Sequence, residues 1–361
     1  MQKLDLTTTS ILLNWAHGKQ PNAIELEELI KKELANTEKA QAFGVNQDNA
    51  QQLIEARAQL FCSAHSNVIE WCHLHGIKDT GNKILNLMWN LWLPLAVNLA
   101  ELRQKLGRTP IQGILGGQGT GKSFLTSILR LLLNHLGYTT VNLSLDDLYK
   151  THTERFRLQK TDPRLIWRGP PGTHDIYLGL KTLENCLQED YGEPIEIPRF
   201  DKSAHNGEGD RGKPETVAQV DIVLFEGWFV GLRPINESIF DNLAEHPLPP
   251  IISQKDVRFA KDNNERLKTY AILWEKLDSL FVLYPEDYRY SKQWRKEAEH
   301  QMIAEGKTGM SDQEIENFVD YFWRSLHPEL FIKILIRQPD VVDLVIKIDK
   351  NHNYSKIYKP N

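Results

Sequence analysis

The sequence predicts an α/β fold in which a mostly parallel central sheet is flanked by helices and preceded by an all-helical N-terminal extension. Two observations carry this prediction. An apolar run at 111–115, a glycine-rich loop, an apolar helical pattern at 124–136 and an alternating pattern at 140–145 give the strand, loop, helix, strand order of a parallel sheet. Before them, apolar residues recur at helical spacings of three and four. We therefore expect a helical extension over residues 1–105 and an α/β domain over residues 106–361.

The extension contains a long amphipathic stretch. From Leu53 to Cys72 the apolar positions keep a helical spacing, and Gly76 supplies a stop. A second helical stretch ends near Gly107. Four tryptophans lie in this region, and we expect them to fill the contact with the α/β domain rather than to bind a ligand: Trp15, Trp71, Trp89 and Trp92. No catalytic constellation is visible in the extension.

Composition restricts the class of protein. The net charge of -5 argues against a bulk nucleic-acid binder. Three cysteines without a Cys-x-x-Cys pair predict reduced structural thiols and no metal site of Cys/His type. The first residues lack the character of a signal or transit peptide. The most apolar stretch, 84–100, is interrupted by asparagines and a proline, so we expect a buried helix there rather than a membrane span. These features predict a cytoplasmic protein that binds neither nucleic acid nor membrane.

The segment between the first strand and its helix reads as a phosphate-binding loop. It consists of Gly116, Gly117, Gln118, Gly119, Thr120, Gly121, Lys122 and Ser123. Glycines let the backbone fold so that successive N–H groups point at phosphates, and the helix that follows adds its positive N-terminal end. Lys122 is then placed to reach the β- and γ-phosphates, and the Ser123 hydroxyl to hold Mg²⁺. The plain alternative, a glycine-rich turn before a helix, is disfavoured by the match at every position.

Acidic residues follow two of the later strands. Asp146 lies in the segment Ser144-x-Asp146-x-x-Tyr149, at the carboxyl end of a strand, where open α/β sheets place their ligands. The apolar run 221–227 ends in Glu226-Gly227, as expected of a buried strand that delivers a carboxylate to a magnesium ion. Two further apolar runs predict buried strands, at 280–284 and 344–348.

These motifs together resemble the phosphoribulokinase, uridine kinase and pantothenate kinase superfamily of P-loop kinases. The resemblance rests on the phosphate loop, the 144–149 segment, the Phe225-Glu226-Gly227 strand end and the basic helix after Tyr284. Within the superfamily, the motifs at 167–175, 198–203 and 225–231 resemble the D-glycerate 3-kinases of plant and cyanobacterial type. The resemblance covers roughly residues 108–350 and departs at Leu148, where many relatives carry phenylalanine. It implies an enzyme that uses ATP and Mg²⁺ to convert D-glycerate to 3-phosphoglycerate in photorespiratory glycerate metabolism.

Phosphoryl transfer assigns a role to each motif. The reaction needs a base near the acceptor hydroxyl, a metal across the phosphates, and cations where charge spreads in the transition state. We predict Lys122, Asp146 and Glu226 to be catalytic, with Asp146 as the base. The predicted metal ligands are Ser123, Asp146 and Glu226, and the resembling kinases imply the contact between Asp146 and the metal. An aspartate after a strand is often only a helix cap, and we assign that role to Asp147.

A charged helical stretch at about 286–325 looks like the basic lid of these kinases. We predict that Arg289 and Arg295 act in catalysis when the lid closes over the phosphates. Lys292 and Lys307 fit a lid and a solvated helix face equally well. Closure would exclude water and suppress hydrolysis of ATP.

The Pro/Gly-rich segment 162–212 is the predicted acceptor site. A small hydroxy acid needs a cationic clamp for its carboxylate and groups that accept its hydroxyl hydrogens. The candidate clamps are Arg168, Arg199, Lys202 and Arg211, and the candidate hydroxyl contacts are His174, Asp175 and His205. Asp175 and His205 match sugar-contacting positions of the resembling nucleoside kinases. For each of these residues, a loop ion pair or a satisfied histidine is the structural alternative.

Other functions stay open at this point. Uridine or pantothenate as acceptor would call for a roomier apolar pocket, which Trp228 and Phe200 would provide, and ribulose 5-phosphate also suits a cationic site. A signalling NTPase is disfavoured because no Asn-Lys-x-Asp segment follows the loop. A non-catalytic ATP-binding protein is disfavoured because the motif residues Lys122, Ser123, Asp146 and Glu226 are all present. The oligomeric state is not predicted.

Overall fold

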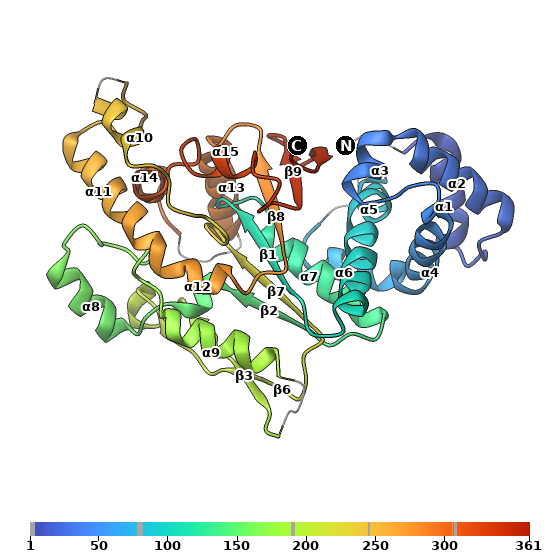
Figure 1. The fold of residues 1–361 in the computed structure, drawn as a ribbon, viewed down its shortest axis with the longest axis horizontal. Coiled ribbons are helices and arrows are strands. Elements are labelled where there is room, and N and C mark those ends of the chain that lie inside the picture. The colour runs from blue at the N-terminus through green and yellow to red at the C-terminus, as the bar shows by residue number, and fades with distance from the viewer. Residues whose placement is uncertain (1–3, 78–81, 189–191, 245, 305, 307–308) are drawn as a thin grey trace.

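The computed structural model describes residues 4–77, 82–188, 192–244, 246–304, 306 and 309–361. Lys307, one of the lysines considered for the lid, lies outside these residues. A six-stranded sheet forms the centre of the molecule, with helices on both faces (Figure 1). In the described part of the chain, no helix is long and apolar enough to cross a bilayer.

The strands of the central sheet run in the order β10-β9-β8-β1-β7-β2, and every neighbouring pair is parallel except β10 with β9. Their bounds are β1 Ile111–Gly116, β2 Thr140–Ser144, β7 Ile222–Gly227, β8 Ser279–Pro285, β9 Leu344–Ile348 and β10 Tyr354–Tyr358. The predicted mostly parallel sheet is therefore confirmed. The sequence reasoning missed β10, a half-buried edge strand that pairs back on β9 after a short turn.

The central strands are apolar along their whole length because both faces of the sheet are covered. In β7, Ile222 and Leu224 point into one core while Val223 and Phe225 point into the other. This alternation explains why the strand reads as a continuous apolar run rather than as an apolar and polar alternation.

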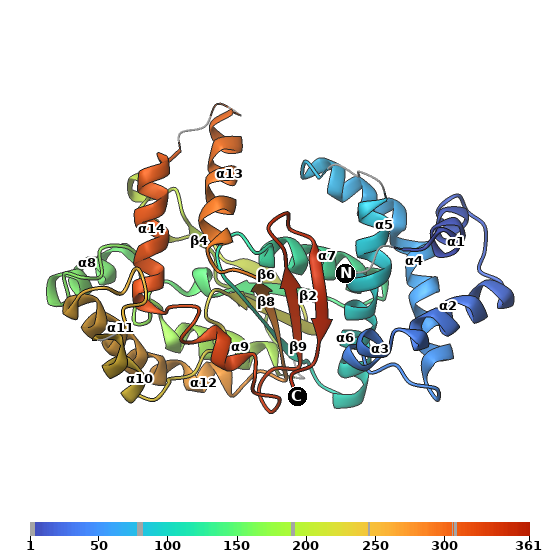
Figure 2. The ribbon, with the colours of Figure 1, turned by 90° about the horizontal axis from the view of Figure 1, so that it is seen from above.

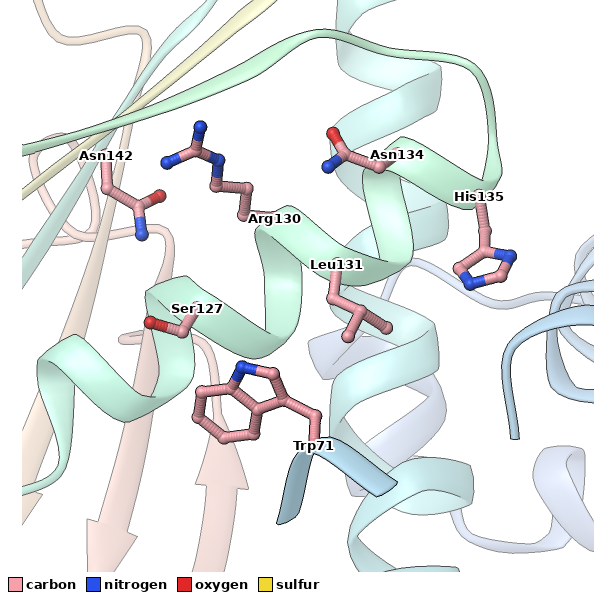
Figure 3. A pocket seen from close by; sticks show the side chains of 7 residues that line it. All are labelled: Trp71, Ser127, Arg130, Leu131, Asn134, His135 and Asn142. Atoms are coloured by element: carbon pink, nitrogen blue, oxygen red, sulfur yellow. The ribbon is translucent and has the colours of Figure 1, made fainter. Parts of the chain in front are cut away.

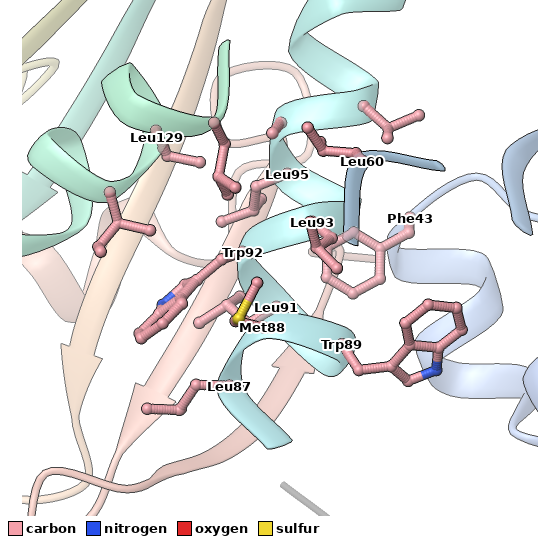
Figure 4. Packing of buried hydrophobic residues seen from close by; sticks show 14 of the residues in the cluster. Phe43, Leu60, Leu87, Met88, Trp89, Leu91, Trp92, Leu93, Leu95 and Leu129 are labelled. Carbon is pink, nitrogen blue, oxygen red and sulfur yellow. The ribbon is translucent and has the colours of Figure 1, made fainter. Parts of the chain in front are cut away.

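Helices of the N-terminal segment cover one face of the sheet together with α7. The segment contains α1 Leu6–Ala16, α2 Ala23–Ala35, α3 Thr37–Ala42, α4 Ala50–Leu74, α5 Lys83–Leu87, a π-helical turn Met88–Trp92 and α6 Leu93–Leu106, and α7 spans Lys122–His135. Their apolar side chains form one continuous core with α7 and the sheet (Figure 4). Trp71 and Trp92 both contact Phe124 of α7, whereas Trp15 and Trp89 pack on each other within the segment.

The opposite face of the sheet is covered by α9 Ile176–Cys186, α11 Gln254–Arg266, α12 Ala271–Trp274 and α15 Ile332–Leu335. The connection between β2 and β7 carries α8 His152–Thr161 and two small hairpins. These pair β3 Ile195–Ile197 with β6 Glu215–Val217, and β4 Phe200–Asp201 with β5 Asp210–Arg211. A short helix, α10 Ser238–Asp241, follows β7.

Two helices fill the region predicted as a lid. They are α13 Tyr290–Ala304 and α14 Asp312–Ser325, which stand side by side and project away from the sheet (Figure 2). Three shorter features complete the fold near the site, namely 3₁₀ turns at Leu145–Leu148, His205–Gly207 and Leu267–Tyr270.

Candidate active site

The phosphate loop connects β1 to α7 in the conformation that anion binding requires. Gly119 and Gly121 have φ angles of +76° and +83°, a left-handed conformation that glycine adopts without strain. The loop is closed by the Thr120 hydroxyl, which donates to the Gly117 carbonyl over 2.8 Å. The Lys122 ammonium donates to the same carbonyl over 3.1 Å. The loop therefore folds back on itself, with Lys122 held across it.

Ser123 and Glu226 meet at the start of α7. Ser123 Oγ donates to Glu226 Oε1 over 2.9 Å, because β7 lies beside β1 and ends level with it. Among the described residues, no group of three or more His, Cys, Asp or Glu side chains could hold a metal ion by itself. Magnesium in kinases is usually held by one or two protein oxygens together with the substrate phosphates. The pair therefore fits a magnesium ion that arrives with the nucleotide.

Asp146 lies on the 3₁₀ turn that follows β2. One carboxylate oxygen accepts from the Lys202 ammonium over 2.7 Å, and the other accepts from the Tyr149 hydroxyl over 3.0 Å. Burial raises the pKa of Asp146, but the charge and hydrogen bond of Lys202 and the bond from Tyr149 outweigh it, so the pKa lies below its usual value. Asp146 is therefore ionised at neutral pH. β2 pairs with β7 so that Ser144 lies opposite Glu226, which brings the turn to the metal side of the loop.

Asp147 is a structural residue, although not the cap itself. Ser144 is the N-cap of the turn, and Asp147 accepts the Ser144 N–H over 3.0 Å, which completes a capping box. Asp147 also accepts from Arg199 over 3.0 Å and from the Phe200 N–H over 3.2 Å. Burial raises its pKa in spite of these partners. Asp147 thus fixes the turn against β4.

Each of the four candidate clamp residues already has a partner. Arg199 binds the carboxylates of Asp147 and Glu215. Arg168 donates to the carbonyl oxygens of Gly207 and Glu208, both over 2.9 Å.

Arg211 binds Asp175 over 2.5 Å, and Lys202 binds Asp146. Lys202 has the most exposed side chain of the ion-paired clamp residues, at 62%. It can therefore exchange its partner most readily. The clamp role of all four residues stays a prediction.

Two of the candidate hydroxyl contacts, Asp175 and His205, bind other groups of the protein. Asp175 caps α9 by accepting the Leu178 N–H over 3.0 Å, in addition to its bond from Arg211. His205 lies 3.1 Å from an oxygen of Asp210 and stacks on His152. Both residues are thus used by the local structure, and their contact with a substrate stays a prediction.

His174 is buried and stacks on Tyr149, the residue whose hydroxyl donates to Asp146. Burial lowers the pKa of His174 to about 3, against the opposite effect of Asp146, so the ring is neutral at physiological pH. Tyr270 OH accepts the Gly172 N–H over 2.8 Å and lies 2.8 Å from His174 Nδ1. Because the hydroxyl oxygen already accepts one hydrogen bond, we assign its own hydrogen to Nδ1 as the acceptor. A neutral imidazole that accepts at Nδ1 carries its proton on Nε2.

Nε2 of His174 is a buried donor without a partner among the described residues. Buried polar groups are nearly always satisfied, so an orphaned donor on a ring that stacks on Tyr149 points to a missing oxygen. The sequence suggested that His174 accepts a hydroxyl hydrogen, whereas the hydrogen bonds assign it to donate. Tyr270 itself gave no signal, because it lies 96 residues from His174 in the chain.

The predicted lid cations are paired within the lid. Arg289 binds Asp287, Lys292 binds Asp320, and Arg295 binds Glu299. A contact that the sequence did not suggest joins the lid to the phosphate loop. Trp294 of α13 packs so closely on the loop that a Cβ at Gly119 would lie 2.8 Å from that of Trp294. The catalytic roles of Arg289 and Arg295 stay predictions.

The apolar acceptor pocket suggested by Trp228 and Phe200 is not formed by these two residues. Trp228 packs on Phe229 and Phe322, whereas Phe200 packs on Tyr149. The cavity that Trp228 lines beside Gly117 has a volume of about 30 Å³, which is room for no more than a few water molecules. A second cavity, of about 520 Å³, lies along α7 between Trp71 and Asn142 (Figure 3). None of the residues that line this second cavity is a predicted site residue.

No protein-family model matches the chain. Three curated proteins are similar in sequence. A kinase of Schizosaccharomyces pombe called mug58, which is described as uncharacterized, is 35% identical, over 60% of this chain and 79% of its own length. The probable ATP-dependent kinase TDA10 of Saccharomyces cerevisiae is 32% identical, over 66% of this chain and 84% of its own length. The chloroplastic D-glycerate 3-kinase of Arabidopsis thaliana is 31% identical, over 67% of this chain and 53% of its own length.

Among solved structures, the D-glycerate 3-kinase of Cryptococcus neoformans matches with a TM-score of 0.66 and 26% identity. The match covers 74% of this chain and 99% of that structure. The alignments to the two yeast kinases span most of each yeast protein, and the phosphate loop with its Ser123 and Glu226 partners is complete. The chain therefore belongs to the family of ATP-dependent P-loop kinases that includes mug58 and TDA10.

Proposed function

We propose that this kinase transfers the γ-phosphoryl group of ATP to D-glycerate and forms 3-phosphoglycerate. The observation that carries the proposal is the arrangement around Asp146. An ionised carboxylate and the exchangeable Lys202 ammonium meet at the end of β2, and Tyr149, which donates to the same carboxylate, stacks on the ring of His174. They match the hydroxyl and the carboxylate of a small hydroxy acid. The Arabidopsis and Cryptococcus proteins, which bear the name D-glycerate 3-kinase, support the same acceptor.

In the proposed reaction, Asp146 accepts the proton of the acceptor hydroxyl. The hydroxyl oxygen forms a bond to the γ-phosphorus while the bond from that phosphorus to the bridging oxygen of ADP breaks. The transition state of such transfers is loose, so alignment and charge matter more than the strength of the base. The lowered pKa of Asp146 is compatible with this role, because the residue has to be ionised to orient the hydroxyl.

Cations balance the charge of the transferring group. Lys122 lies across the phosphate loop and is placed to contact the β- and γ-phosphates. Ser123 and Glu226, with Asp146 nearby, would hold Mg²⁺, which neutralises phosphate charge when bound. Arg289 and Arg295 would have to leave Asp287 and Glu299 to reach the site, which lid closure would allow.

The polarity of the site favours a small hydroxy acid over uridine or pantothenate. The groups around Asp146 are polar: Tyr149, His174 and Lys202. A polar site of this kind suits a carboxylate with two hydroxyls.

Identification of the product tests the proposal. The purified chain is incubated with ATP, Mg²⁺ and D-glycerate, and the mixture is followed by ³¹P NMR. We expect the signals of ADP and 3-phosphoglycerate to grow together, and neither to grow with Asp146→Asn. Release of inorganic phosphate without a phosphorylated acid would contradict the proposal, and a 2-phosphoglycerate product would contradict the choice of hydroxyl.

A further inference from the structure

A cavity of about 520 Å³ opens in the N-terminal helical segment. It lies among α2, α3 and the π-helical turn, and Glu33, Lys39, Trp89 and Asn90 contribute to its wall. Its volume is in the range of small-molecule sites. The residues that line it include none of those assigned to the kinase reaction. The cavity is therefore separate from the active site.

Around Glu33, at the floor of the cavity, there is more positive than negative charge once Arg57, which lies behind the lining residues, is included. Arg57 donates to both carboxylate oxygens of Glu33, over 3.0 and 3.2 Å, and both side chains are buried. Lys39 Nζ donates to the same carboxylate over 2.9 Å. Two cations thus share one carboxylate. A buried charge that lacks a counter-charge is strongly destabilising, so a further negative group is expected here.

Lys39 has one donor left for that group. An ammonium has three donors, and Lys39 uses one on Glu33 and one on the neutral Oδ1 of Asn90, over 2.7 Å. Within the described ranges of the chain, its third donor has no acceptor. Burial lowers the pKa of Lys39 to about 8, and Arg57 adds to this effect while Glu33 opposes it.

The charges at the rim of the cavity do not supply this group. Lys32 binds Asp5 over 2.7 Å and Glu28 over 3.2 Å, so the rim carries one carboxylate more than it has cations, but neither carboxylate contacts Lys39. Glu38 binds Lys356 of β10 over 2.6 Å. The rim pairs are also more exposed than the floor, and water screens them.

The π-helical turn shapes the inner wall. Such turns are rare, and many occur at functional sites. This one presents Asn90 to Lys39 and places the Trp89 ring 5.2 Å from the Arg57 guanidinium carbon (Figure 4 shows Trp89). The Asn90 amide is held in turn by Asn86, over 2.6 Å. The turn therefore fixes a polar wall next to the uncompensated charge.

We propose that this cavity binds a small anion, whose carboxylate or phosphate oxygen accepts the third hydrogen bond of Lys39 and supplies the missing negative charge.

Asn90→Asp is the most direct test, because it builds the missing charge into the protein with almost no change in shape. Asn86 can rotate its amide to donate to the new carboxylate. Binding of acetate and of inorganic phosphate is measured by calorimetry on the full chain at matched ionic strength, with AMP-PNP and Mg²⁺ saturating the nucleotide site. The two probes distinguish a carboxylate ligand from a phosphate ligand.

We expect at least one probe to bind the wild-type chain, and Asn90→Asp to weaken that binding by about 10-fold or more through the loss of a charge-assisted contact. Lys39→Met should weaken it similarly, while the exposed Lys31→Met should leave it unchanged. Asn90→Asp should also raise the melting temperature, because it adds a negative charge beside Lys39. This measurement also checks that the variant is folded. Absence of binding to the wild-type chain would overturn the proposal, as would binding that survives Asn90→Asp and Lys39→Met.

Discussion

The hydroxyl of Tyr270 lies 2.8 Å from Nδ1 of His174 and accepts the Gly172 N–H over 2.8 Å. We infer from this arrangement that the hydroxyl donates to Nδ1, so that the proton of the neutral ring lies on Nε2. Long-range ¹H–¹⁵N NMR correlation should show His174 protonated at Nε2. A proton on Nδ1 would contradict this assignment.

Removal of the Tyr270 hydroxyl should affect both the tautomer and stability. In Tyr270→Phe, the Gly172 N–H loses its acceptor, so we expect the free energy of unfolding to fall by about 1–3 kcal/mol. His174 should then populate both tautomers, and kcat/KM for the acceptor should fall while KM for ATP stays near its wild-type value. The exposed Tyr177→Phe is the matched control, and equal effects of the two variants would refute the role of Tyr270.

His174 should also make stability depend on pH. Its pKa is about 3 in the folded chain and about 6.5 in an unfolded chain, so only the unfolded state binds the proton between these values. Above pH 6.5 the ring is neutral in both states and has no effect on the pH dependence of stability. As the pH falls from 6.5 toward 3, protonation of the unfolded state lowers the free energy of unfolding. The wild-type free energy of unfolding should therefore drop below pH 6.5 more steeply than that of His174→Gln.

Below pH 6, the free energy of unfolding of the wild type should fall by up to about 1.4 kcal/mol per pH unit more than that of His174→Gln. Denaturant titrations between pH 5 and 7 measure it in a range where most carboxylates stay ionised. The exposed His17→Gln should follow the wild-type curve. Parallel curves for the wild type and His174→Gln would show that His174 titrates normally in the folded chain.

Lys122 is expected to be essential for phosphoryl transfer. Lys122→Ala removes the cation that lies across the phosphate loop, and we expect the rate to fall by roughly 10²-fold or more. Steady-state assays of ADP release at saturating acceptor measure the loss, with the exposed Lys160→Ala as control. A folded Lys122→Ala protein with near-normal turnover would refute the assignment of the loop.

The neighbouring residues Asp146 and Asp147 should separate chemistry from structure. Asp146→Asn should slow transfer by roughly 10²–10⁴-fold, because the group that receives the acceptor proton is lost, while ATP binding stays broadly intact. Asp147→Asn should instead lower the free energy of unfolding by about 1–2 kcal/mol, since Arg199 and the capping box lose a charged acceptor. If the two substitutions exchanged these effects, the roles would be reversed.

The phosphate loop and the buried strands of the mostly parallel sheet could be predicted from the sequence because their signals are local. Glycines at 119 and 121 encode a backbone conformation, and apolar runs encode strands that are buried on both faces. The meeting of Ser123 with Glu226 followed from the parallel sheet, in which the carboxyl ends of neighbouring strands lie together.

The electrostatics of the acceptor segment could not be predicted in the same way. Arg199 looks like a free clamp in the sequence, yet it is bound by Asp147 and Glu215, which lie 52 and 16 positions away. Its partners depend on hairpins of two and three residues per strand, which are too short to give a periodic pattern. The contact of Trp294 with Gly119 could not be predicted either, because it arises only when α13 packs on the phosphate loop.

Comparison of kcat/KM across acceptors tests the central claim most directly. ADP release is measured with D-glycerate, L-glycerate, uridine, pantothenate and ribulose 5-phosphate at saturating ATP and Mg²⁺. We predict that D-glycerate exceeds each of the others by about 10²-fold or more, because the polar groups around Asp146 are left unpaired by an acceptor that lacks the matching oxygens. Ready turnover of uridine or pantothenate, with no release of ADP that depends on D-glycerate, would leave the kinase family in place and contradict the proposed substrate.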